Sequence, residues 1–323
     1  MRAAALLLLF AATALAQFKS TATLVVAPTT IVDAKGQYVD NLDPSDLVLY
    51  DNNVRQAIQV DESYTPISLV VAIQTAANSA AVLDKLGASG ALFTDLLAGD
   101  RGETALVTFS DDVRTRLEFT SDSTRLKNSL STLRVQGTGA MALDAVMQAL
   151  TMLAKRPAGN RKILLMVAEK RDRTSQLKFE TVLQAAQRQN VLIYWLTYSP
   201  FLEPYTAKPK ATKSKDPSKD GRPLPPDMAP GSLITVFTEM NQADKPDNSA
   251  LLTQTTGGRA INFLRKEALE EAIQAIGAEV HRQFILSFTP RTAKAGEFHN
   301  LRVAVHGRKD LIARTREGYW SVP

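Results

Sequence analysis

Four apolar runs, each long enough for one strand, constrain the fold of this chain more than any other feature of its sequence. The runs cover residues 69–73, 105–109, 163–168 and 191–196. Uninterrupted apolar runs of this length are typical of strands that are covered on both faces of a sheet. Apolar residues at helical spacing lie between or after them, at 80–98, 123–133, 143–153, 177–189 and 266–280. This alternation predicts an α/β domain with a doubly wound, mostly parallel sheet.

Three details of this region lead to further predictions. Residues 113–119 alternate polar and apolar side chains, which indicates a half-exposed strand paired as a hairpin with the run at 105–109. Ser123 stands where a helix begins, and we expect it to cap that helix. Three aromatic residues lie near the end of the fourth run. We interpret them as core and rim packing, and an aromatic contact surface is the alternative. The three residues are Tyr194, Trp195 and Tyr198.

The two ends of the chain show a different pattern, in which short strands are separated by polar turns. The N-terminal strands are expected at 23–27, 30–33, 38–39, 47–50 and 57–60, and the C-terminal ones at 283–288, 301–305, 311–315 and 318–320. A β unit as small as the N-terminal one is marginal alone. We therefore expect residues 17–66 and 281–323 to form one small antiparallel β-sandwich, with the α/β domain of residues 67–280 inserted between them.

The first sixteen residues have the features of a signal peptide. A positive start at Arg2 precedes an apolar stretch at 3–12, and a small-x-small cleavage signal occupies 14–16. The apolar stretch is too short for a permanent membrane-spanning helix, although an uncleaved anchor is the alternative. No later segment is long and apolar enough to cross a membrane. Residues 1–16 are therefore assigned as a signal peptide, and the mature protein is expected to be exported to the periplasm or the extracellular space.

Composition excludes several kinds of chemistry. The chain has 323 residues, no cysteine and three histidines. It therefore has no disulfide, no thiol nucleophile and no zinc site built on thiolates. Its formal net charge of +5 is modest for this length and does not indicate a partner that is a nucleic acid.

Residues 200–248 interrupt the α/β pattern. Nine of the chain's 15 prolines lie between Pro200 and Pro246, and the stretch 208–222 holds six basic and two acidic residues. Such a segment can bury little apolar surface, so we interpret it as a long solvated loop inserted in the α/β domain. A basic docking arm is the alternative.

Several short motifs occur along the chain in a characteristic order. They lie at 32–39, 42–50, 100–109, 143–145, 256–259 (Thr-Gly-Gly-Arg), 283–290 and 314–319. Each motif is weak, but their order and spacing resemble the von Willebrand factor type A domain. The whole mature chain except 200–248 resembles a group of exported bacterial proteins related to that domain.

The resemblance implies a metal-ion-dependent adhesion site at the carboxyl end of the sheet. The implied pattern is D-x-S-x-S after the first strand, a threonine before a helix, and an aspartate after a later strand, which together hold Mg²⁺ through oxygen ligands. This sequence departs from the pattern at every ligand position. The residues at these positions are Gln74, Ala76, Asn78, Ala140 and Glu169. We expect these residues to form a partner-binding rim, with Thr138 and Asp172 as further members. One carboxylate without aligned hydroxyls should not hold Mg²⁺, so we expect no metal or other cofactor. An unrelated cation site built from Asp111, Asp112 and Asp172 is the alternative, and turn or surface carboxylates are the favoured interpretation.

No catalytic motif is found. Residues 137–142 fit G-x-G-x-x-A, but they follow an expected helix end and not a strand, so a glycine-rich rim loop is favoured over a dinucleotide site. The chain has no phosphate-binding loop and no nucleophile elbow. His281, His299 and His306 lie in or beside the expected β-sandwich and suggest surface or strand positions more than general bases. The sequence therefore does not predict an enzyme.

Two functions remain as hypotheses. The first is an exported, non-enzymatic, adhesion-type module that binds a protein at the rim without a bridging metal. The second is a structural envelope protein that contacts an anionic surface polymer through the basic segment 200–248. A hydrolase that uses one of the histidines is a third possibility, for which the sequence holds no positive signal.

Overall fold

The computed structural model describes residues 24–39, 41–61, 65–86, 92–170, 172–198, 247–263, 267–290 and 295–321. The expected signal peptide at 1–16 lies outside these residues, as does all but the end of the expected insertion at 200–248. The domain boundaries drawn from the sequence stay predictions.

The larger part of the molecule is built on a six-stranded sheet with the order β10-β9-β8-β5-β6-β7. Five of its strands are parallel, and β7 pairs with β6 as an antiparallel hairpin, as predicted. The strands are β5 (Ile67–Gln74), β6 (Glu103–Phe109), β7 (Val113–Thr120), β8 (Arg161–Ala168), β9 (Val191–Tyr198) and β10 (Ala260–Phe263). The residues of β5 and β9 are buried throughout, which accounts for the uninterrupted apolar runs.

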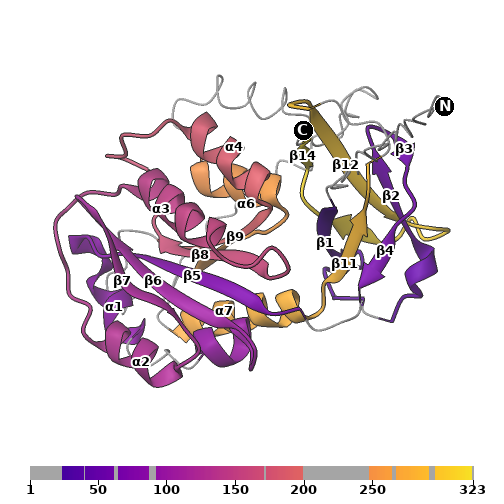
Figure 1. Cartoon of the computed structure of the whole chain (residues 1–323). Helices are drawn as coiled ribbons and strands as arrows, with labels where there is room; N and C mark the ends of the chain where they lie inside the picture. The colour runs from indigo at the N-terminus through magenta and orange to yellow at the C-terminus, as the bar shows by residue number, and fades with distance from the viewer. Residues whose placement is uncertain are drawn as a thin grey trace, which may run out of the picture.

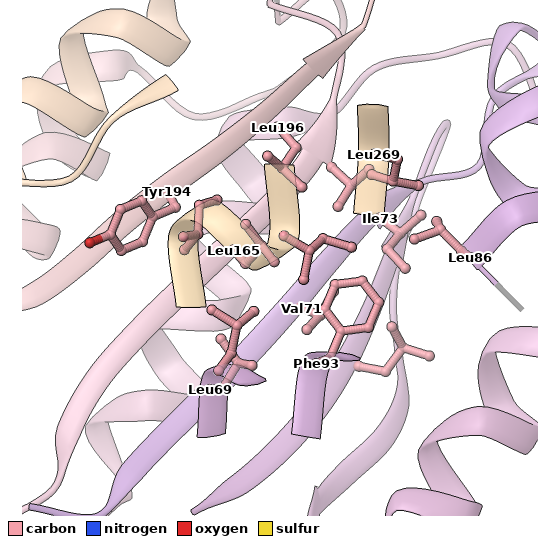
Figure 2. Close-up of a cluster of buried hydrophobic side chains, with 14 of the residues drawn as sticks. Leu69, Val71, Ile73, Leu86, Phe93, Leu165, Tyr194, Leu196 and Leu269 are labelled. Atoms are coloured by element: carbon pink, nitrogen blue, oxygen red, sulfur yellow. The ribbon is translucent and has the colours of Figure 1, made fainter. Parts of the chain in front are cut away.

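Helices cover both faces of this sheet (Figure 1). One face carries α3 (Ala142–Ala154), α4 (Phe179–Gln189) and α6 (Asn248–Thr256). The other carries α1 (Ala80–Leu86), the π-helical segment η3 (Leu92–Ala98), α2 (Ser123–Ser131) and α7 (Glu267–His281). Figure 2 shows the core on the second face, where Val71 and Ile73 of β5 pack with Phe93 of η3. The predicted doubly wound α/β fold is confirmed.

The two ends of the chain form two antiparallel four-stranded sheets that share a separate apolar core. Their orders are β13-β1-β11-β4 and β14-β12-β2-β3. The N-terminal strands are β1 (Val25–Val32), β2 (Leu47–Asp51), β3 (Val54–Arg55) and β4 (Gln59–Asp61). The C-terminal strands are β11 (Phe284–Phe288), β12 (Phe298–Val305), β13 (Ile312–Arg314) and β14 (Gly318–Trp320). Each sheet mixes strands from both ends, so the α/β part is inserted in a β-sandwich, as predicted.

Four local predictions need correction. The expected strands at 23–27 and 30–33 form one strand, β1, which passes through Pro28. The strand expected at 38–39 is a single bridge between Tyr38 and Val32. The expected helix at 80–98 is described as two pieces, α1 and η3. The cap of α2 is Asp122 and not Ser123, because the Asp122 carboxylate accepts hydrogen bonds from two backbone N–H groups of the first turn.

Helix α6 and strand β10 were not predicted. The sequence of α6 has no apolar stripe, because most of its buried positions are polar. Thr253, Thr255 and Thr256 each donate a side-chain hydrogen bond to a carbonyl one turn back. These bonds satisfy buried hydroxyls without leaving a pattern that hydrophobic periodicity can detect.

The α/β part and the β-sandwich meet at the buried carboxylate of Glu279, near the end of α7. From the sandwich side, the Tyr38 hydroxyl donates to Oε2 at 3.1 Å and Arg314 pairs with Oε1. From the α/β side, the Tyr194 hydroxyl donates to Oε1 at 2.7 Å, and Arg259 Nε lies 2.7 Å from Oε2. In Figure 2 the Tyr194 ring lies at the edge of the apolar cluster, with its hydroxyl directed away from the other labelled side chains. We call Glu279 and these four partners the junction cluster.

A second contact between the two parts depends on Arg316, which is buried and follows β13. Its guanidinium donates to the Gln187 carbonyl at 2.5 Å and to the Asn190 side chain, both at the end of α4. Gly257 of the Thr-Gly-Gly-Arg turn has φ +88°, and a Cβ there would lie 2.7 Å from the Arg316 backbone nitrogen. Glycine is thus required for both the turn and the close approach. Within the described residues, no helix combines the length and the hydropathy needed to span a bilayer.

Candidate binding rim

Four loops meet at the carboxyl edge of the central sheet, and we call them together the rim. They cover residues 74–79, 110–112, 134–141 and 169–175. Backbone hydrogen bonds join them: Gln136 N–H donates to the Thr75 carbonyl at 2.6 Å, and Met141 N–H donates to the Ser110 carbonyl at 3.2 Å. Loops at the carboxyl ends of parallel strands converge in this way, which makes this edge the usual ligand site of open α/β sheets.

The structure brings Gln74 and Glu169 together in the centre of the rim. Gln74 ends β5, Glu169 follows β8, and these two strands are neighbours in the sheet. Gln74 Oε1 accepts a hydrogen bond from the Glu169 backbone N–H at 3.0 Å. Both residues are buried, and only 7% of the Glu169 side chain is exposed. The Gln74 side chain therefore ties the first rim loop to the fourth.

Glu169 forms an ion pair with Arg173, a residue that the sequence analysis did not single out. The distance from Arg173 Nη2 to Glu169 Oε2 is 3.2 Å. The Arg173 backbone N–H also donates to the Ala140 carbonyl at 3.1 Å, which fixes the start of this side chain beside the 134–141 loop. Burial raises the pKa of Glu169, and the positive charge of Arg173 partly opposes that rise.

Three buried polar atoms of the rim have no hydrogen-bond partner within the described residues. They are Gln74 Nε2, Asn78 Oδ1 and Glu169 Oε1. By contrast, the Ser79 hydroxyl in the same loop is paired with the Tyr198 hydroxyl at 2.6 Å. An unpaired buried polar atom costs roughly 1–3 kcal/mol, so three such atoms within one set of loops call for an explanation. All three belong to positions that the sequence analysis assigned to the rim.

Asp172 lies in a rim loop and makes helix-capping contacts that the sequence analysis did not predict. Its Oδ1 accepts hydrogen bonds from the backbone N–H groups of Ala142 and Leu143, at 2.8 and 3.3 Å, and from the Ser175 hydroxyl at 2.6 Å. Met141, the residue that precedes α3, offers no side-chain cap. Asp172 therefore caps α3 from another loop, and it joins the 169–175 loop to the helix that follows the 134–141 loop. The sequence signal for this role is Met141, a residue whose side chain cannot cap the helix that begins at residue 142.

Asp111 supports the glycine-rich loop. Its Oδ1 accepts a hydrogen bond from Gly139 N–H at 2.7 Å, and the Thr138 N–H lies 3.3 Å from Oδ2. A Cβ at Gly137 would lie 2.1 Å from Asp111 Oδ2. Gly137 and Gly139 therefore leave room for the Asp111 carboxylate beside the loop. This agrees with the interpretation of 137–142 as a glycine-rich rim loop. Thr138 itself is exposed, and its position is set by this contact.

The aromatic candidates of the sequence analysis and His299 belong to the core, whereas His281 and His306 are exposed. Tyr194, Trp195 and Tyr198 are buried, which confirms core packing and contradicts an exposed aromatic surface. His299 is buried in the β-sandwich, where its Nδ1 lies 2.8 Å from Asp51 Oδ1, and the Tyr319 hydroxyl donates to the other oxygen at 2.9 Å. This arrangement joins β12, β14 and β2 within the β-sandwich.

Comparison with known proteins identifies the larger part of the molecule. Residues 81–208 match the family model of the von Willebrand factor type A domain. The chain carries a von Willebrand factor type A domain. The matched stretch begins after the Gln74–Asn78 loop, and the two sheets of the β-sandwich lie outside it.

One solved structure supports this fold, and two others are similar with TM-scores below 0.5. A von Willebrand factor type A protein from Catenulispora acidiphila aligns over 86% of this chain and 73% of its own, with 9% identity and a TM-score of 0.50. The conserved hypothetical protein BatB from Bacteroides thetaiotaomicron aligns over 66% and 98%, with 15% identity and a TM-score of 0.42. The PilB minor pilin from Streptococcus sanguinis, as a point mutant, aligns over 69% and 63%, with 10% identity and a TM-score of 0.44. No curated protein matches the chain. At these identities the likeness concerns the fold.

The rim of this type A domain does not fit a magnesium ion. Ala76 and Ala140 are buried and have no side-chain oxygen. Gln74 Oε1 is used by the Glu169 N–H, and Glu169 is paired with Arg173. Mg²⁺ requires a nearly octahedral set of oxygen ligands, which these contacts do not supply. Across the described part of the chain, no group of three or more histidine, cysteine, aspartate or glutamate side chains is arranged to hold a metal.

Proposed function

We propose that this chain is an exported, non-enzymatic protein-binding module of adhesion type, which binds its partner at the rim without a bridging metal. The observation that carries the proposal is the burial of Glu169 and its ion pair with Arg173. This buried carboxylate stands at the position where the family resemblance implies a metal ligand, and a protein arginine is its ion-pair partner. The unpaired polar atoms around it favour a binding site over a purely structural cluster.

Two further arguments support this reading. Type A domains are interaction modules, and the catalytic motifs sought in the sequence are missing. Export rests on the expected signal peptide at 1–16. The alternative function, contact with an anionic polymer through 200–248, stays a prediction from composition.

A crosslinking experiment tests binding at the rim. A photo-crosslinking residue in place of Thr138, which is exposed on the rim, should capture a discrete envelope or surface protein. The same residue in place of Lys309, which is exposed in the β-sandwich, is the matched control and should not capture it. Capture should be unchanged in EDTA. Capture that is lost in EDTA and restored by Mg²⁺, or that is equal at both positions, would overturn the proposal.

A further inference from the structure

Each of the described acidic side chains of the rim forms contacts within the protein. Asp112 pairs with Arg114 at 2.5 Å, and Asp111 and Asp172 accept backbone hydrogen bonds, as described above. Glu169 is held by Arg173. Asp111 and Asp112 are exposed, so these two negative charges can be reached from solvent although both are already engaged in contacts within the protein.

Basic side chains are also accessible on the same surface. Of the described residues in the stretch 169–173, Lys170 and Arg173 are basic. Lys170 is exposed, and 47% of the Arg173 side chain is exposed although its guanidinium reaches Glu169. A partner that reaches the point where the sheet's loops converge therefore meets two exposed cations, Lys170 and Arg173, as well as the exposed aspartates.

Arg173 is held in place from two sides. Its backbone N–H is fixed to the Ala140 carbonyl, and its guanidinium is fixed to a carboxylate that is almost fully buried. A guanidinium has five N–H donors in a planar fork, and the contact with Glu169 is made through Nη2. Because the side chain is already restrained, a ligand that pairs with its other donors loses less conformational entropy on binding.

We propose that Arg173 receives a carboxylate of the protein partner directly, so that a fixed guanidinium supplies the positive charge at the centre of the rim. The partner surface is then an acidic segment, and its carboxylate belongs to an aspartate or glutamate side chain or to a chain terminus. Glu169 is a positioning residue, because it aims the guanidinium and does not touch the ligand. This inference rests on the proposed function and names the chemistry of its partner.

The planar fork matters as much as the charge. Arginine can pair with both oxygens of a carboxylate, whereas lysine presents a single strongly hydrated ammonium. Replacing Arg173 by lysine should therefore keep the long-range attraction and lose the paired geometry. Lys170 provides the matched control, since it is a neighbouring exposed cation without a buried carboxylate described at its side.

The test measures binding of labelled peptides to the full chain by fluorescence anisotropy in EDTA. One probe is a blocked peptide with a central aspartate, and the second has asparagine in its place. The third is the asparagine peptide with an unblocked C-terminal carboxylate. The chain should bind the first or the third probe more tightly than the second, and the favoured one identifies the source of the carboxylate. Arg173→Ala should weaken that binding about tenfold, since loss of a charge-assisted pair is of that order.

The variants separate a specific site from general attraction. Arg173→Lys should recover only part of the affinity, and Lys170→Ala should change it about twofold or less. Arg173→Lys and Lys170→Ala should melt like the parent chain. Arg173→Ala leaves the buried Glu169 carboxylate without its ion-pair partner and should melt at a lower temperature, so binding is measured well below the melting temperature of every variant. Equal binding of all three probes would overturn the proposal, as would equal losses in Arg173→Ala and Lys170→Ala. If the probes fail but Thr138 still captures a partner in EDTA, the proposed function stands and the role of Arg173 is wrong.

Discussion

Two buried glutamates of this molecule, Glu279 and Glu169, are satisfied to very different degrees. Glu279 is fully buried, and two tyrosines and two arginines from both parts of the chain surround its oxygens. Glu169 is nearly as buried, but it has one arginine, itself half-exposed, and its second oxygen has no described partner. A buried charge is stable where it is paired and hydrogen-bonded, as at the junction cluster. The difference teaches that burial alone does not distinguish the two carboxylates, and that the proposal for Glu169 rests on its incomplete pairing.

The largest effect is expected from Glu279→Gln. The amide removes the buried charge that compensates Arg259 and Arg314, and two partly buried cations remain at the junction without a counter-charge. Removing one partner of a buried ion pair costs roughly 3–5 kcal/mol, which corresponds to a fall in melting temperature of about 10 °C for a chain of this size. Thermal and urea unfolding measure the loss.

Glu271→Gln is the matched control for this change. Glu271 lies on the same helix, α7, but is exposed, so its replacement should shift stability by no more than about 0.5 kcal/mol. If the two variants have the same free energy of unfolding, the junction cluster does not hold the two parts together. Glu279 would then not be the stabilising carboxylate that the comparison with Glu169 assumes.

Much of the fold could be predicted, but the contacts of the two glutamates could not. The buried strands β5 and β9 give uninterrupted apolar runs, and the amphipathic helices give apolar stripes, so the order of the elements followed from periodicity. Glu279 lies three residues after the buried Ile276 and so shares the inner face of α7, but the sequence analysis did not single it out. Its partners come from residues up to 241 positions away in sequence, and no local pattern encodes such contacts.

The rim shows the same limit. The family resemblance supplied Gln74, Ala140 and Glu169, and the structure brings these three positions together. The roles of Arg173 and Asp172 depend on the path of the 169–175 loop, which sequence periodicity does not determine. Their roles follow only from three-dimensional contacts, the ion pair of Arg173 and the capping bonds of Asp172.

An effect of intermediate size is expected from Asp172→Ala. Loss of this cap leaves the first N–H groups of α3 and the Ser175 hydroxyl without their acceptor, which should cost about 1 kcal/mol. Asp122→Ala is the matched control, because Asp122 caps α2 from its own N-terminus. The two variants should lose similar stability in urea unfolding. Only Asp172→Ala should also reduce capture at the rim, since it releases the loop that carries Arg173. Unchanged capture would show that this loop is held without the cap.

The smallest effect on stability is expected from Glu169→Gln, and its dependence on pH has a definite sign. Because burial raises the pKa of Glu169, the folded chain holds this proton more tightly than the unfolded chain does. The resulting stabilisation is fully present below the ordinary glutamate pKa of about 4.3 and is lost as the pH rises through the raised value. The glutamine variant lacks that loss, so relative to the parent chain it should gain a little stability as the pH increases across this window. Melting temperatures measured from acid to neutral pH test the sign. A variant that is clearly less stable than the parent at neutral pH would mean that the pair with Arg173 outweighs the burial of the charge, and Glu169 would then resemble Glu279.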